Sequence, residues 1–158
     1  MTNLALMLKL VHVLGAAVLF GTGLGIAFFM WKANRTRDAA FIGGTARLVV
    51  IADALFTASA VVVQPLSGAA LAWAMGYSLT ESWIVVSLAL YVFVGLCWLP
   101  VVWIQMQLRN LATGAALRGV RLPDIYHQLY RAWFWLGWPA FIGVIAIFAL
   151  MLWKPVLW

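Results

Sequence analysis

Residues 4–31 read LALMLKLVHVLGAAVLFGTGLGIAFFMW, and this apolar stretch decides the fold. A helix needs roughly 20 apolar residues to cross a bilayer, so the stretch is long enough for one membrane span. Three further stretches, at about 48–75, 82–107 and 132–153, have the same character. The sequence therefore predicts an all-α fold, a bundle of four transmembrane helices.

The composition excludes an ordinary soluble domain. Hydrophobic residues make up 66% of the chain and charged residues only 9%, whereas about 25% of a soluble domain is charged. The 158 residues are enough for a single integral membrane domain over 1–158. Cys97 is the only cysteine, which excludes an internal disulfide and a cysteine cluster for zinc or iron–sulfur.

Basic residues are concentrated in and around two of the three connections between the spans. Loops rich in Lys and Arg stay in the cytoplasm, so both termini are expected outside, on the periplasmic side of a bacterial inner membrane. The net charge of +6 indicates contact with the lipid bilayer and its anionic head groups, and not with nucleic acid. The basic residues concerned are Lys32, Arg35, Arg37, Arg47, Arg109, Arg118, Arg121 and Arg131.

His12 lies inside the first apolar stretch, where a titratable and metal-competent side chain is costly. Such a residue is a functional-site hypothesis by default. Gly15 and Gly23 share its helix face and would let a helix or a flat macrocycle approach. Gln64 and Tyr91 are expected at a similar depth, so the three polar residues predict one layer in the outer half of the bundle.

Asp53 indicates a second polar layer, nearer the cytoplasmic side. A lone carboxylate in hydrocarbon either pairs with a cation or holds a proton. Pairing with Arg47, Arg109 or Arg131 is the favoured expectation because these arginines border that face. His127, the second histidine, is expected at the cytoplasmic interface and therefore cannot join His12 on one cofactor within a single chain.

Several stretches carry a family resemblance that covers nearly the whole chain, most specifically Val63-Gln-Pro, CWLP at 97–100 and GWPAF at 137–141. With them the chain resembles an uncharacterised bacterial family of four-span inner-membrane proteins, the domain of unknown function DUF2269. This resemblance implies the fold and no established activity.

The first span, with a histidine followed by glycines, is also distantly similar to HemJ-type protoporphyrinogen oxidases and CopD-type copper-resistance domains. In the HemJ-type family the first-span histidine is associated with haem b, and His12 matches that position. The chain lacks a lysine in its third span and has fewer histidines and methionines than most CopD-type domains. Porphyrinogen oxidation therefore does not transfer, and little favours copper transport.

Three functional hypotheses remain open, and whether the protein is an enzyme is open with them. The first is a haem-b protein with a redox or electron-transfer role, in which His12 ligates the metal and Gly15, Gly23, Gln64 and Tyr91 surround the ring. The second is a non-enzymatic scaffold, assembly factor or accessory subunit. The third is a small transporter or proton path through His12 and Asp53. The small-residue faces are compatible with a homodimer or a membrane partner subunit, and the transport hypothesis requires an oligomer.

Overall fold

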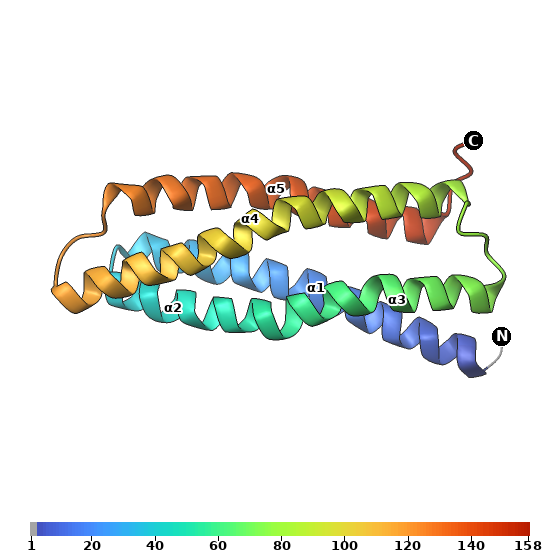
Figure 1. The fold of residues 1–158 in the computed structure, drawn as a ribbon, viewed down its shortest axis with the longest axis horizontal. Coiled ribbons are helices and arrows are strands. Elements are labelled where there is room, and N and C mark those ends of the chain that lie inside the picture. The colour runs from blue at the N-terminus through green and yellow to red at the C-terminus, as the bar shows by residue number, and fades with distance from the viewer. Residues whose placement is uncertain (1–2) are drawn as a thin grey trace.

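The computed structural model describes residues 3–158, and this part of the chain is helical with no strand. The helices α2, η1 and α3 follow one another without a break, so the chain forms four rods (Figure 1). Each rod is long and apolar enough to cross a membrane. The predicted all-α fold with four transmembrane helices is confirmed. The elements are α1 (Asn3–Thr36), α2 (Ala39–Ala52), the π-helix η1 (Asp53–Thr57), α3 (Ala58–Met75), α4 (Ser82–Arg118) and α5 (Asp124–Trp153).

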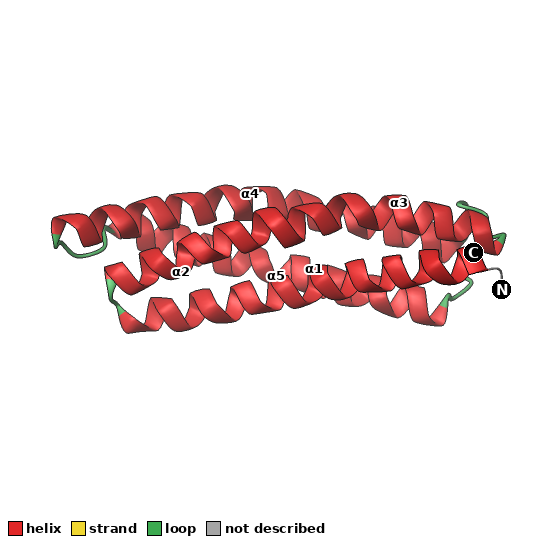
Figure 2. Ribbon diagram, turned by 90° about the horizontal axis from the view of Figure 1, so that it is seen from below, coloured by secondary structure: helices red, strands yellow, loops and turns green. Residues whose placement is uncertain are grey.

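The two ends of the bundle differ in charge. The α1–α2 turn and the α4–α5 loop lie together at one end, called the basic end below, while the start of α1 and the end of α5 lie at the other (Figures 1 and 2). Helix α4 has 37 residues, or ~55 Å of helix, against ~30 Å of bilayer hydrocarbon. The rods extend beyond their apolar stretches mainly at the basic end. The apolar stretches of the sequence end at the first charged residues at this end, but the helices themselves continue past those residues.

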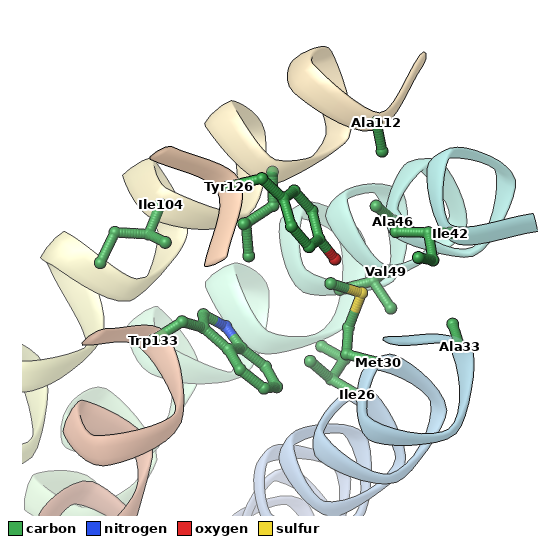
Figure 3. Close-up of a cluster of buried hydrophobic side chains, with 11 residues drawn as sticks. Ile26, Met30, Ala33, Ile42, Ala46, Val49, Ile104, Ala112, Tyr126 and Trp133 are labelled. Atoms are coloured by element: carbon green, nitrogen blue, oxygen red, sulfur yellow. The ribbon is translucent and has the colours of Figure 1, made fainter. Parts of the chain in front are cut away.

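The main hydrophobic core lies toward the basic end, where all four rods contribute side chains (Figure 3). Helix α4 packs along α5 and α2, and α1 packs along α3 and α2. Met30 of α1 and Tyr126 of α5 are fully buried at its centre. The core consists of Ile26, Met30, Ala33, Ile42, Ala46, Val49, Ile104, Leu108, Ala112, Tyr126 and Trp133.

Helix α2 packs so closely against α4 that the backbones of the two helices are almost in contact at Gly43 and Thr113. A Cβ atom placed on Gly43 would lie 3.1 Å from both the main-chain nitrogen and the hydroxyl of Thr113. The start of α2 is fixed by Asp38, whose carboxylate accepts hydrogen bonds from the N–H groups of Ala40 (2.9 Å) and Phe41 (3.4 Å). Together these contacts set where the second rod begins and how close it comes to the third.

The opposite end is closed by the C-terminal segment. The Ser82 hydroxyl accepts a hydrogen bond from the Leu157 N–H (3.0 Å). Lys154 donates to the Tyr77 hydroxyl (2.9 Å), and its ammonium lies over the rings of Tyr77 (4.5 Å) and Trp83 (5.5 Å). These contacts tie the end of α5 to the α3–α4 connection.

The direction of insertion is testable with two matched fusions. We expect a phosphatase that is active only outside the cytoplasm to stay inactive when inserted at Gly119, in the α4–α5 loop, because that loop carries the basic residues. The same enzyme inserted at Ser78, in the α3–α4 connection, should be active. The reverse pair of results would overturn the expected orientation.

Candidate functional site

The first polar cluster, called the His12 cluster, consists of His12, Gln64 and Ser67 and joins α1 to α3. The His12 ring nitrogen Nδ1 lies 3.0 Å from the Ser67 hydroxyl. A Cβ atom on Gly68 would lie 3.0 Å from Cε1 of the same ring. The absence of a side chain at Gly68 therefore lets α3 pack directly against the imidazole edge.

Gln64 inserts its amide into the space beside Gly15. With the amide oriented so that donors face acceptors, Nε2 donates to the main-chain oxygen of His12 (2.9 Å) and Oε1 accepts from the N–H of Ala16 (3.2 Å). A Cβ atom on Gly15 would lie 2.8 Å from this amide. The absence of a side chain at Gly15 therefore leaves room for the Gln64 amide. The structure brings His12, Gly15 and Gln64 together, as expected from the sequence.

Tyr91 does not hydrogen-bond to the His12 cluster but to the backbone of α3. Its hydroxyl donates a hydrogen bond to the main-chain oxygen of Val61 in α3. Pro65 lies four residues after Val61 inside the same helix and has no N–H to offer that oxygen. Tyr91 thus replaces the helical hydrogen bond that Pro65 removes, and it contacts the α3 backbone rather than His12.

A haem ring does not fit beside Gly15, because Gln64 fills that space. Gly23 lies eleven residues after His12, or roughly 16 Å further along α1. It is exposed, and a Cβ atom there would meet nothing within 4 Å outside its own stretch of helix. His127 is exposed in the first turns of α5, at the basic end, and so stays apart from His12 as expected. Residues 3–158 contain no group of three or more His, Cys, Asp or Glu side chains that could hold a metal ion.

The second cluster, called the Asp53 cluster, consists of Asp53, Trp98, Gln105 and Trp133. Asp53 is 4% exposed and stands at the start of η1, where the helical turn widens. Its carboxylate accepts a hydrogen bond from the indole Nε1–H of Trp98 (3.3 Å). With its amide correctly oriented, Gln105 donates to the other carboxylate oxygen (3.2 Å) and accepts from the indole Nε1–H of Trp133 (3.2 Å).

In this structure indole and amide donors, and not an arginine, contact the Asp53 carboxylate. Within residues 3–158 no ion pair joins Asp53 to Arg47, Arg109 or Arg131. Arg47 and Arg131 are exposed, and Arg109 donates to the side chain of its neighbour Asn110 (2.9 and 3.1 Å). Long basic side chains extend toward the lipid head groups and keep their charge in water. The Asp53 carboxylate is contacted instead by the indole of Trp98 and the amide of Gln105, both on α4.

The two clusters are separate. Gln64 follows Asp53 by eleven positions, or roughly 16 Å of helix, and no hydrogen-bonded side chains link the clusters within the described residues. Between them the buried hydroxyl of Thr57 lies near Asp53 and makes no hydrogen bond to the His12 cluster within the described residues. A continuous proton path from Asp53 to His12 is therefore not formed by these side chains.

Three contributors were not assigned their roles from sequence. They are Ser67, Trp98 and Trp133, which the sequence alone does not match to His12 or Asp53. One signal was available: Trp98 and Gln105 are seven residues apart and therefore share a helix face. What the clusters do physically is join helices, since hydrogen bonds between membrane helices are worth about 0.6–2 kcal/mol each.

Comparison with known proteins gives one match. The family model described as predicted integral membrane protein (DUF2269) matches residues 6–155. No curated protein and no solved structure matches the chain. The matched range covers all four rods except the first three residues of α1, and it includes every residue of the two polar clusters. The chain therefore belongs to the DUF2269 family of integral membrane proteins, a family of unknown function.

Proposed function

We propose that the protein is a non-enzymatic scaffold or accessory subunit of the bacterial inner membrane. The observation that carries this proposal is that the polar side chains of both clusters form hydrogen bonds between helices. His12, Gln64 and Ser67 hold α1 against α3, and Asp53 and Gln105 hold η1 against α4. Intramembrane polar residues used in this way fix helix register.

This role implies a membrane partner, which is a second copy of the chain or a different subunit. Gly21 and Gly23 of α1 are exposed, and a Cβ placed on either would meet no described atom within 4 Å beyond its own stretch of helix. Small residues on an exposed membrane face let a second helix approach closely. The proposed contact therefore involves this part of α1.

The replacement of His12 by leucine tests the role of the His12 cluster. The variant loses the hydrogen bond to Ser67, so we expect its free energy of unfolding in lipid–detergent micelles to fall by about 1 kcal/mol. Ser67→Ala should cost a similar amount, and the double variant should cost no more than either, because one interaction is removed in all three. His127→Leu, at the exposed histidine, is the control and should leave stability unchanged.

A visible spectrum of the same proteins, expressed with ample haem, separates this proposal from its main rival. The scaffold role predicts no Soret band in the wild-type protein. A Soret band that His12→Leu removes and His127→Leu preserves would contradict it.

Binding of haem b at His12 is the second candidate function. It is supported by the arrangement of the imidazole: Nδ1 is engaged by Ser67, and Nε2 has no hydrogen-bond partner within the described residues. A ligating histidine commonly donates its other ring N–H to a second group, which fixes the tautomer. Because Gln64 occupies the space beside Gly15, the ring would have to lie on the Nε2 side of His12.

A further inference from the structure

We propose that the basic end of the bundle binds the phosphate group of an anionic phospholipid between Arg35 of α1 and Arg131 of α5. A cavity of about 260 Å³ opens between these two helices. Its polar lining consists of Asn34, Arg35, Tyr130 and Arg131. The inference does not rest on the scaffold role, because it concerns a different end of the molecule from the His12 cluster.

The two arginines supply uncompensated positive charge. Both side chains are exposed, and neither forms an ion pair with a carboxylate within residues 3–158. The guanidinium of Arg35 lies 5.1 Å from the centre of the Trp31 ring, which holds it at the cavity edge. A guanidinium presents a planar fork of N–H donors that matches two phosphate oxygens at once.

Two neutral donors complete the polar side of the cavity. The Asn34 side-chain oxygen accepts a hydrogen bond from the hydroxyl of Tyr126 (3.1 Å), which leaves the amide N–H₂ for a ligand. The hydroxyl of Tyr130 has no partner in the described chain, and its ring is stacked between Tyr126 (6.4 Å) and Trp133 (5.8 Å). These donors are therefore held in place by the core before any ligand arrives.

The rest of the lining points to a lipid and not to a soluble anion. Trp31, Phe134 and Trp135 form the apolar side, and Trp31 and Trp135 are 39% and 69% exposed. Aromatic rings of this kind lie at the boundary between head groups and acyl chains. The volume is below the ~300–1,000 Å³ of pockets that enclose a whole drug-sized ligand, so it suits a head group whose chains remain in the bilayer.

Native mass spectrometry with defined lipids tests the site. The protein is stripped of lipid and titrated with phosphatidylglycerol or with phosphatidylcholine, and we expect the first to bind in preference. A basic side chain near an anionic lipid surface contributes about fivefold to affinity, so R35Q/R131Q should weaken phosphatidylglycerol binding about 25-fold. R35K/R131K keeps the positive charge but loses the planar fork of donors. Its affinity for phosphatidylglycerol should lie between those of the wild type and R35Q/R131Q.

R109Q/R118Q is the matched control, because it removes two arginines from the same end of the bundle without touching the cavity lining. It removes the same amount of surface charge but no side chain of the cavity, so it should weaken phosphatidylglycerol binding clearly less than R35Q/R131Q does. Equal losses in the two glutamine variants would reduce the effect to general surface charge and overturn the site. Competition by inorganic phosphate at concentrations equal to the lipid would identify a soluble anion as the ligand and overturn the lipid proposal. If R35Q/R131Q loses its helical circular dichroism, the single variant R131Q, at an exposed position, decides the question.

Discussion

The replacement of Gln105 by leucine should lower the free energy of unfolding by about 3 kcal/mol, because it leaves two buried polar groups without partners at ~1–3 kcal/mol each. One carboxylate oxygen of Asp53 loses its donor, and the indole N–H of Trp133 loses its acceptor. Leucine has a similar volume, so little of the loss should come from packing. Reversible unfolding in lipid–detergent micelles, followed by circular dichroism, measures the change.

Gln107→Leu is the control for this prediction. Gln107 lies two residues further along α4, is partly buried, and makes no side-chain hydrogen bond in the described chain. It should change stability by less than about 0.5 kcal/mol, as expected for a site without special contacts. A second check combines Gln105→Leu with Trp133→Phe, which removes the stranded indole N–H and should restore part of the loss. Equal stabilities for the Gln105 and Gln107 variants would show that the Asp53 cluster does not stabilise the bundle.

The second large effect is expected at Gly43, where leucine should cost about 3 kcal/mol through overpacking. The Cβ alone would lie 3.1 Å from the backbone nitrogen of Thr113. Backbone cannot turn aside as a side chain can, so α2 would have to move away from α4. The same unfolding measurement reports this loss, and a drop in helix–helix packing should also appear as faster proteolysis.

The neighbouring glycine provides a control with the same chemistry. Gly44 is exposed, and a Cβ there would meet nothing within 4 Å. Because leucine is the better helix former by up to about 1 kcal/mol, Gly44→Leu should be neutral or stabilising. The difference between the two variants therefore isolates the contact with Thr113 from the intrinsic preference of the helix. If both variants were neutral, the close approach of α2 and α4 would be refuted.

The helices and their inward faces were predictable because both depend on periodic properties of the sequence. Asp53, Thr57, Ala60, Gln64 and Ser67 follow each other at intervals of three and four, a spacing that predicts one shared helix face. Four of them are buried and Gln64 is half-buried. Such a stripe indicates a buried face regardless of which helix covers it.

The partners of those faces were harder to predict. Asp53 had three arginines within the expected reach, and yet Trp98 and Gln105 contact it. The choice depends on side-chain direction and on the attraction of arginine to the head groups. A hydrogen bond between helices and a contact of arginine with anionic head groups are each worth about 1 kcal/mol, so neither dominates. The replacement of a helical bond by Tyr91 likewise depends on where α4 crosses α3, which no local pattern encodes.

The π-helix η1 has a consequence for how the second rod meets its neighbours. A turn that closes from residue i to i+5 holds one more residue than an α-turn, which offsets the side chains that follow by about 100°. Before this turn the rod packs on both α4 and α1, and after it the rod packs mainly on α1. One continuous helix thus contacts α1 along its length, and η1 marks the point after which it no longer packs along α4. The placement of Asp53 at that point means that its carboxylate is fixed by the same turn that directs Gln64 and Ser67 toward His12.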